Sequence, residues 1–299
     1  MKTFLLSWSL LLSTFATSQA QTADTYFVQG KKLYKMKKYP EAIARLTKAL
    51  ALDSTQAKYY FYRAMCRAES SRPNKFLADM NQALALDSKN DWYYYKRAIA
   101  YYRLKKYSLA LQDINQAIRL DPQYSLYHEI KGNIYSDMPE YLKALKCYDQ
   151  ALKLDPQRAN TYNLRGAVKD DMGWYQEALA DYNQAIVLEP NNAGFYNNRG
   201  LAQWHLNRIT QALQDYHKAL QLAPQQVDAY YNRGLLYHQQ AKRNSFTRKA
   251  NAYRALQNFN QAIELAPTQA KFYLNRGRTK ALLGKKQKAM DDFKKAKAL

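Results

Sequence analysis

The chain has 299 residues, of which 47% are hydrophobic and 14% aromatic, so we expect a packed core rather than disorder. Nine glycines and eight prolines are too few for the turns of an all-β sandwich or barrel, and two cysteines exclude a disulfide-rich scaffold. The 46 basic and 24 acidic residues leave a net charge of +22, which can attract anionic polymers, lipid surfaces or nucleic acid.

Residues 1–20 are typical of a secretory signal peptide. Lys2 gives a positive start, residues 4–12 form a mostly apolar run, and Ser18 and Ala20 are small residues where signal peptidase reads the chain. The apolar run is shorter than the roughly 20 residues that a membrane-spanning helix needs, although an uncleaved anchor is the alternative. We therefore expect cleavage after Ala20 and an exported chain, periplasmic or extracellular, with no transmembrane segment after signal cleavage.

From residue 23 onward, the same residue types return every 34 positions. Four residue types in one register indicate an internal repeat, which excludes two unrelated domains. The register contains Tyr26, Tyr60, Tyr94, Tyr162, Tyr196 and Tyr230; Pro122, Pro156, Pro190 and Pro224; Gly132, Gly166, Gly200 and Gly234; and Ala110, Ala144, Ala178 and Ala212.

This pattern resembles the tetratricopeptide repeat (TPR), which has aromatic residues at positions 4, 11 and 24, small residues at 8, 20 and 27, and Pro at 32. The resemblance implies an all-α fold: a right-handed α-solenoid of stacked antiparallel helix pairs, the TPR superhelix, as a single domain over residues 21–299. The eight repeats are expected near 23–56, 57–90, 91–124, 125–158, 159–192, 193–226, 227–269 and 270–299.

Within each repeat we expect helix A over about positions 2–14 and helix B over about positions 18–31. Small residues at positions 8 and 20 let the two helices approach closely, and Pro at position 32 ends helix B. Pro73 and Phe76 depart from the pattern and predict a distorted second hairpin. Repeat seven has nine additional residues, which either lengthened helices or a protruding loop can accommodate.

No catalytic or cofactor motif is present, so an enzyme, a cofactor and a metal site are not expected. Asp137, Asp171 and His205 share one repeat position, but side chains one hairpin apart are about 10 Å from each other, too far to share an ion. Cys66 and Cys147 are separated by a whole repeat and are expected to be free thiols. Basic residues at position 7 and Asp at position 23 are interpreted as structural pairs between helices A and B.

The resemblance implies that partners bind on the concave face, which helix A lines. Five aromatic candidates lie in repeats one to three, and five asparagines in repeats five to eight can present amides to a peptide backbone. The alternatives are packing beneath neighbouring side chains for the aromatic rings and a generic solvated surface for the asparagines. The candidates are Phe27, Phe61, Trp92, Tyr95, Tyr102, Asn163, Asn197, Asn198, Asn232 and Asn275.

We therefore predict a non-catalytic protein–protein interaction scaffold that binds an extended peptide or partner segment in its concave groove. The alternative is a basic adhesion module for anionic envelope polymers or lipids. Salt discriminates between them, because binding to a polyanion weakens steeply with ionic strength whereas aromatic anchoring persists. Export disfavours nucleic acid as the partner.

Overall fold

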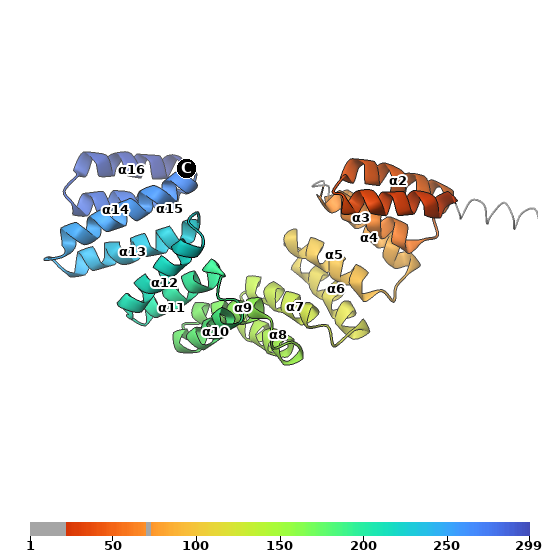
Figure 1. The fold of residues 1–299 in the computed structure, drawn as a ribbon, viewed down its shortest axis with the longest axis horizontal. Coiled ribbons are helices and arrows are strands. Elements are labelled where there is room, and N and C mark those ends of the chain that lie inside the picture. The colour runs from red at the N-terminus through yellow and green to blue at the C-terminus, as the bar shows by residue number, and fades with distance from the viewer. Residues whose placement is uncertain (1–21, 70–72) are drawn as a thin grey trace, which may run out of the picture. The chain divides into compact units, whose positions relative to one another are not determined.

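The computed structural model describes residues 22–69 and 73–299, and within these ranges the regular elements are all α-helices (Figure 1). The predicted signal peptide lies outside the described residues. In the described ranges, no helix is both long and apolar enough to cross a membrane. The chain divides into two compact units between Met138 and Pro139, and each unit is considered by itself.

In the first unit, residues 22–35 are helical and belong to repeat one. The helices that follow are α2 (Tyr39–Leu52), α3 (Ala57–Glu69), α4 (Pro73–Leu86), α5 (Asp91–Arg103), α6 (Tyr107–Leu120) and α7 (Ser125–Asp137). The hairpin partners α3 and α4 pack together, as do α5 and α6. Successive hairpins touch through α2 with α3, α4 with α5, and α6 with α7.

The second unit repeats this arrangement. Its helices are α8 (Tyr141–Leu154), α9 (Ala159–Asp171), α10 (Tyr175–Leu188), α11 (Ala193–His205), α12 (Ile209–Leu222), α13 (Val227–Arg243), α14 (Arg248–Leu265), α15 (Ala270–Leu282) and α16 (Lys286–Ala298). Each helix A also contacts the helix A of the next repeat, as α9 does with α11 and α11 with α13. The prediction of an all-α fold of stacked helix pairs is confirmed. How the units continue into one superhelix stays a prediction.

The small residue at position 8 lies against the large side chain at position 24. A Cβ atom on Gly166 would lie 2.8 Å from the Tyr182 ring, and a Cβ atom on Gly200 would lie 2.9 Å from the Tyr216 ring. Both rings are fully buried. A methyl group does not fit at these distances, so the close approach of helices A and B requires glycine here.

The helix boundaries differ from the prediction by one residue, since helix A covers positions 1–13 and helix B usually covers 17–30. Two positions after helix A ends, the backbone adopts a left-handed conformation, for example at Lys105 (φ 56°) and Gly173 (φ 78°). This conformation turns the chain back toward helix B. Helix B ends two residues before the repeated proline, as α6 does before Pro122 and α8 before Pro156.

The two irregular repeats keep the helix-pair architecture. In repeat two, α4 begins at Pro73, where the first helical position tolerates proline, and it has the same 14 residues as α6. Phe76 is buried against Ala64 and Met80. The expected distortion of this hairpin is therefore wrong for its helix lengths. In repeat seven, α13 has 17 residues and α14 has 18, so the insertion lengthens both helices by about one turn.

Arginine–aspartate pairs join helix A to helix B, as predicted. Arg199 donates from Nε and Nη2 to the two carboxylate oxygens of Asp215, each at 2.7 Å, and its Nη1 donates to Asn183 of the preceding repeat. Lys169 and Lys280, which replace an aromatic residue at position 11, reach the aspartate of their own repeat at 2.7 Å. The other bidentate pairs are Arg63–Asp79, Arg97–Asp113, Arg165–Asp181 and Arg276–Asp292.

Candidate partner-binding face

The aromatic residues at position 5 join neighbouring repeats. Each packs against an aromatic residue at position 3 of the next repeat. The rings of Phe61 and Tyr93 are stacked, and the other two pairs are tilted. The ring centroids are 4.9 Å apart for Phe27 and Tyr59, 4.7 Å for Phe61 and Tyr93, and 5.2 Å for Tyr95 and Tyr127.

These ring pairs leave little of the candidate residues Phe27 and Tyr95 accessible to solvent. Phe27 is 8% exposed and Tyr95 is 6% exposed, and both belong to the cores of their repeats. For these two rings the structure shows packing beneath neighbouring side chains, which was the alternative, because aromatic rings of the next helix A lie against them. Phe61 is half-buried in its stack with Tyr93. A role for these residues in binding stays a prediction.

Trp92 and Tyr102 are also engaged within the first unit. The ammonium group of Lys96 lies 4.4 Å from the centre of the Trp92 ring, in a cation–π contact. Burial and a hydrogen bond with Asp137 raise the pKa of Tyr102 to about 12, so its hydroxyl stays protonated at neutral pH. Both side chains are half-buried, which leaves part of each surface accessible.

In the second unit, asparagine side chains form a hydrogen-bonded row across α9, α11 and α13. Asn198 Nδ2 donates to Asn163 Oδ1 at 2.9 Å, and Asn232 Nδ2 donates to Asn197 Oδ1 at 3.1 Å. Within α11, Asn197 Nδ2 donates to Asn198 Oδ1 at 3.2 Å and joins the two bonds. Among the described residues, Asn163 Nδ2 and Asn232 Oδ1 have no partner, so the row ends in a free donor and a free acceptor.

Asn275 makes more hydrogen bonds than any of the other four asparagines. It is 8% exposed, and its Nδ2 donates to the Tyr231 hydroxyl at 3.0 Å and to the Lys271 carbonyl at 2.9 Å. Arg278 donates to its Oδ1 at 3.3 Å. These hydrogen bonds engage both Nδ2 and Oδ1 of Asn275. The bond to Tyr231 joins α13 to α15, so Asn275 helps to pack these two helices together.

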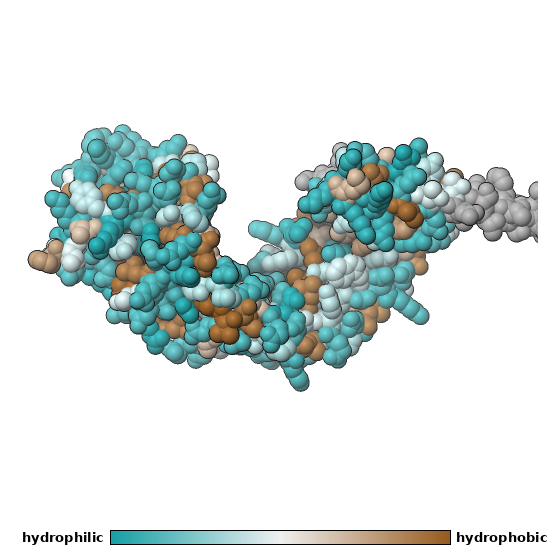
Figure 2. Space-filling model, in the orientation of Figure 1, coloured by the Kyte–Doolittle hydropathy of each residue, from teal (hydrophilic) through white to brown (hydrophobic). Residues whose placement is uncertain are grey.

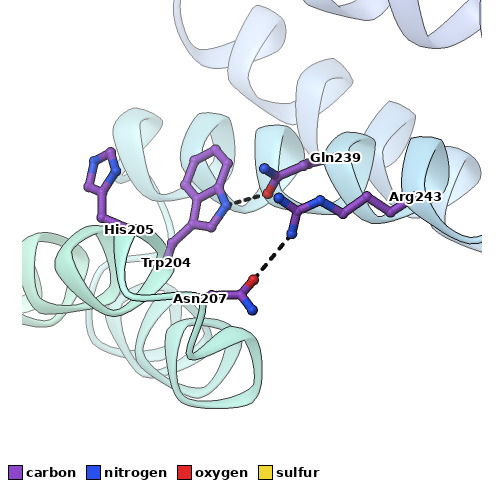
Figure 3. A pocket seen from close by; sticks show the side chains of 5 residues that line it. All are labelled: Trp204, His205, Asn207, Gln239 and Arg243. Carbon is purple, nitrogen blue, oxygen red and sulfur yellow. Dashed lines mark hydrogen bonds between the residues drawn. The ribbon is translucent and has the colours of Figure 1, made fainter.

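A pocket of about 390 Å³ lies between the C-terminal end of α11 and the C-terminal half of α13 (Figure 3). Trp204 Nε1 donates to Gln239 Oε1 at 2.5 Å, and Arg243 Nη1 donates to Asn207 Oδ1 at 3.1 Å. His205 completes the lining. The pocket therefore combines an indole wall, an imidazole and a guanidinium group at its edge.

The polar groups of the pocket favour an acidic or neutral polar guest. Arg243 is exposed and lies in the additional turn of α13, and it has no acidic partner among the described side chains. The His205 ring stacks 4.5 Å from the Tyr175 ring, and burial lowers the pKa of His205, which favours the neutral imidazole at pH 7. A guest group can thus accept a hydrogen bond from Arg243 beside an aromatic wall.

The asparagine row and the pocket lie on the same side of their helices. Trp204 follows Asn197 by seven residues, and Gln239 follows Asn232 by seven, which is nearly two helical turns. The bond between Trp204 and Gln239 and the bond between Asn197 and Asn232 both join residues 35 apart. One face of α11 and α13 therefore carries both features, about 10 Å apart along the helix axis.

Comparison with known families identifies the repeat. Models described as TPR repeat match residues 132–173, 171–207 and 205–240, and models described as tetratricopeptide repeat match residues 27–91, 92–124 and 270–299. The chain belongs to the tetratricopeptide repeat family. No curated protein sequence matches the chain.

Several solved structures have a similar TPR fold. A tetratricopeptide repeat protein from Parabacteroides merdae is 18% identical, with a TM-score of 0.68, and the match covers 90% of this chain and 99% of that one. Pseudomonas aeruginosa PilF is 19% identical, with a TM-score of 0.61 over 71% of this chain and 96% of its own. YrrB, described as a TPR protein with an unusual peptide-binding site, is 22% identical, with a TM-score of 0.50 over 62% and 95%. At these identities the likeness shows the fold alone.

Sequence reasoning missed Trp204, Gln239 and Arg243. A usable signal was present, because residues at one repeat position contact the following position of the next TPR repeat, 35 residues later. This rule relates Trp204 to Gln239 as it relates Asn197 to Asn232. Arg243 could not be placed by the repeat pattern, since it belongs to the insertion of repeat seven.

Proposed function

We propose that this TPR protein is a non-catalytic scaffold that binds an extended segment of a partner protein along α9, α11 and α13. The single observation that carries the proposal is the shared face on which the asparagine row and the pocket of Trp204 lie. Side-chain amides can hydrogen-bond a peptide backbone regardless of its sequence, whereas the pocket can select one side chain. The description of YrrB as a TPR protein with a peptide-binding site supports the same use of the fold.

The dimensions of the face suit a short extended segment. The separation of about 10 Å between the asparagine row and the pocket corresponds to about three residues of extended chain. The free Nδ2 of Asn163 and the free Oδ1 of Asn232 offer a donor and an acceptor to backbone groups. Arg243 favours an acidic or polar side chain in the pocket, since its guanidinium lacks a carboxylate partner among the described residues.

A peptide-display selection tests the proposal. Random peptides are selected on the wild-type chain, and the affinities of the selected peptides are measured for Arg243→Gln and Trp204→Ala. We expect each substitution to weaken binding about tenfold or more, as for a residue that contributes directly to an interface. Arg248→Gln and Trp174→Ala are matched controls, because they remove the same residue types from exposed positions elsewhere in the second unit.

The selection also has a result that contradicts the proposal. If the selected peptides bind both pocket variants as tightly as the wild type, the partner segment lies elsewhere. Circular dichroism spectra of the variants check that the helices are retained. Trp204 packs beside Leu236 and Ala212, so Arg243→Gln, which changes an exposed side chain, is the decisive variant.

We further propose that the protein is exported after cleavage following Ala20. The support is the charge, apolar run and small residues of residues 1–20. Mass spectrometry of the protein produced in a host with export machinery tests this directly. The proposal predicts a chain that begins at Gln21, whereas membrane-associated chains that retain Met1 contradict it.

A further inference from the structure

The hairpin of repeat seven extends beyond its neighbours. Helices α13 and α14 have 17 and 18 residues, whereas α11 has 13, α12 has 14, and α15 and α16 have 13 each. Four additional residues add about 6 Å to a helix, so the turn of residues 244–247 projects about one helical turn past the adjacent A–B turns. In Figure 1 this turn lies at the left edge of the second unit.

The turn presents a single aromatic side chain to solvent. Phe246 is 94% exposed, more than any other large hydrophobic residue in the described ranges. The backbone beneath it is well held, because Asn244 Oδ1 accepts hydrogen bonds from the backbone N–H groups of Phe246 (2.9 Å) and Thr247 (3.2 Å). Asn251 Nδ2 also donates to Thr247 Oγ1 at 3.1 Å. The ring is therefore held in solvent by a hydrogen-bonded turn, although exposing its apolar surface to water is unfavourable in free energy.

Cationic residues flank this turn along the chain. Lys242, Arg248 and Lys249 are exposed, lie within four residues of Phe246, and have no acidic partner among the described residues. From the next hairpin, the ammonium group of Lys285 lies 4.7 Å from the centre of the exposed Tyr253 ring. Figure 2 shows the turn as a hydrophobic tip next to hydrophilic surface.

We propose that this tip docks on the surface of an anionic phospholipid bilayer. Phe246 enters the boundary between headgroups and acyl chains, and Lys242, Arg248 and Lys249 contact the lipid phosphates. The arrangement fits a bilayer because Phe246 is on the projecting turn and the cationic residues are on the helix ends that flank it. A bilayer likewise has an apolar interior beneath a charged headgroup layer. A soluble polyanion would engage the cations but leave Phe246 in water, and a protein partner would require more apolar area than one ring supplies.

This proposal goes beyond peptide binding and is independent of it. The tip and the pocket of Trp204 are in the same unit, so a bilayer-bound scaffold would hold its partner segment near the membrane surface. Arg243 belongs to the pocket, and the membrane test leaves it unchanged. The failure of one proposal therefore does not imply the failure of the other.

The test measures partition of the full chain into vesicles made of equal parts phosphatidylglycerol and phosphatidylcholine, compared with phosphatidylcholine alone. Residues 1–20 are common to all variants. The triple variant Lys242→Gln, Arg248→Gln, Lys249→Gln is expected to lower the preference for anionic vesicles about 150-fold, because each of the three cations near such a surface contributes about 1 kcal/mol. The matched control is Lys32→Gln, Lys35→Gln, Lys38→Gln, which removes the same charge from repeat one.

A second measurement follows Phe246 itself. A photoreactive benzoyl-phenylalanine at position 246 is expected to crosslink to lipid on anionic vesicles, and the same group at Val187, which is 72% exposed on α10, is expected to remain uncrosslinked. Three results would overturn the proposal. The first is the absence of a lipid crosslink at position 246. The second is a loss of partition in the repeat-one control that equals the loss in the triple variant. The third is crosslinking of position 246 to a protein, in place of lipid, when both are present.

Discussion

The ring of Phe61 stacks on the ring of Tyr93, with centroids 4.7 Å apart and an angle of 24° between the planes. Phe61 lies in α3 and Tyr93 in α5, so the stack joins helix A of repeat two to helix A of repeat three. The same relation recurs between Tyr231 and Phe272, whose centroids are 5.0 Å apart across the elongated repeat. In these ring pairs, the position-5 aromatic residue contributes to the packing of one repeat against the next.

Truncating such a ring is therefore expected to destabilise the chain. Phe27→Ala should lower the free energy of unfolding by about 3 kcal/mol, because it leaves a cavity between Tyr59 and Tyr62. Urea denaturation followed by circular dichroism measures this change. Val28→Ala, at the adjacent and 62% exposed position, is the control and should change stability by less than about 0.5 kcal/mol. Equal effects at the two positions would show that Phe27 does not support the core.

The Arg–Asp pairs predict opposite effects on stability for two opposite substitutions. Asp215 is buried and accepts two hydrogen bonds from Arg199, so Asp215→Asn should cost about 2 kcal/mol of stability. Repeat seven has Asn258 at the equivalent position, where Oδ1 accepts from Arg233 Nε at 2.8 Å and burial lowers the pKa of Arg233. Asn258→Asp should restore the charge pair and raise stability, offset in part by loss of the Nδ2 bond to the Arg254 carbonyl.

Thermal unfolding of the two variants and the wild type checks these opposite signs. The double variant, with both substitutions, tests whether the two repeats act independently. Its change in stability should equal the sum of the single changes, because the sites lie in different hairpins. A gain in stability from Asp215→Asn, or a loss from Asn258→Asp as large as that from Asp215→Asn, would contradict the assigned role of the pairs.

The sequence predicted the features that depend on contacts within one repeat. The small residue at position 8, the proline after helix B and the pairing of positions 7 and 23 each recur often enough to reveal the hairpin. Contacts between repeats were harder to predict, because they join different positions of successive repeats. Phe61 is a candidate for partner binding when its own repeat is considered alone, whereas Tyr93 at position 3 of the next repeat packs against its ring.

The candidate site was predicted in part for the same reason. Asn197 and Asn232 were recognised as a polar row, but their mutual hydrogen bond follows from the 35-residue relation and not from the 34-residue period. The insertion in repeat seven is unique in the chain, so periodicity could not place Arg243 or Phe246. Its length alone fits either a loop or two additional helical turns, and only the structure distinguishes them.

The turn between α5 and α6 offers a stabilising substitution. Lys105 has φ 56°, a conformation that glycine adopts without strain, whereas the next residue, Lys106, has φ −86°. Lys105→Gly should therefore raise the unfolding free energy by about 0.5–1 kcal/mol, and Lys106→Gly should lower it because glycine adds entropy to the unfolded chain. Both variants lose one lysine, so charge is matched. Urea denaturation that shows the reverse order would refute the assigned backbone conformation.

Asp170 gives stability a distinct dependence on pH. Its Oδ1 is buried without a hydrogen-bond partner, and burial and the nearby charge of Asp171 raise the pKa of Asp170 to about 6. The unfolded carboxyl has a pKa of about 3.9, so the folded chain binds this proton more tightly. The contribution of Asp170 to stability is therefore fully present below about pH 4 and is lost as pH rises through about 6.

Asp170→Asn removes this titration while keeping the size of the side chain. At pH 7 the variant should be more stable than the wild type by about 1 kcal/mol, a value reduced for the partial solvent access of the carboxyl. The difference should shrink as pH falls from 7 to 4, because the wild-type carboxyl becomes protonated and neutral like the amide. Melting temperatures of both chains across this range measure it, with Asp228→Asn, on an exposed carboxyl of α13, as the control for net charge. A difference that is constant with pH would show that Asp170 is charged in the fold throughout, and its pKa would then have to lie near the unfolded value.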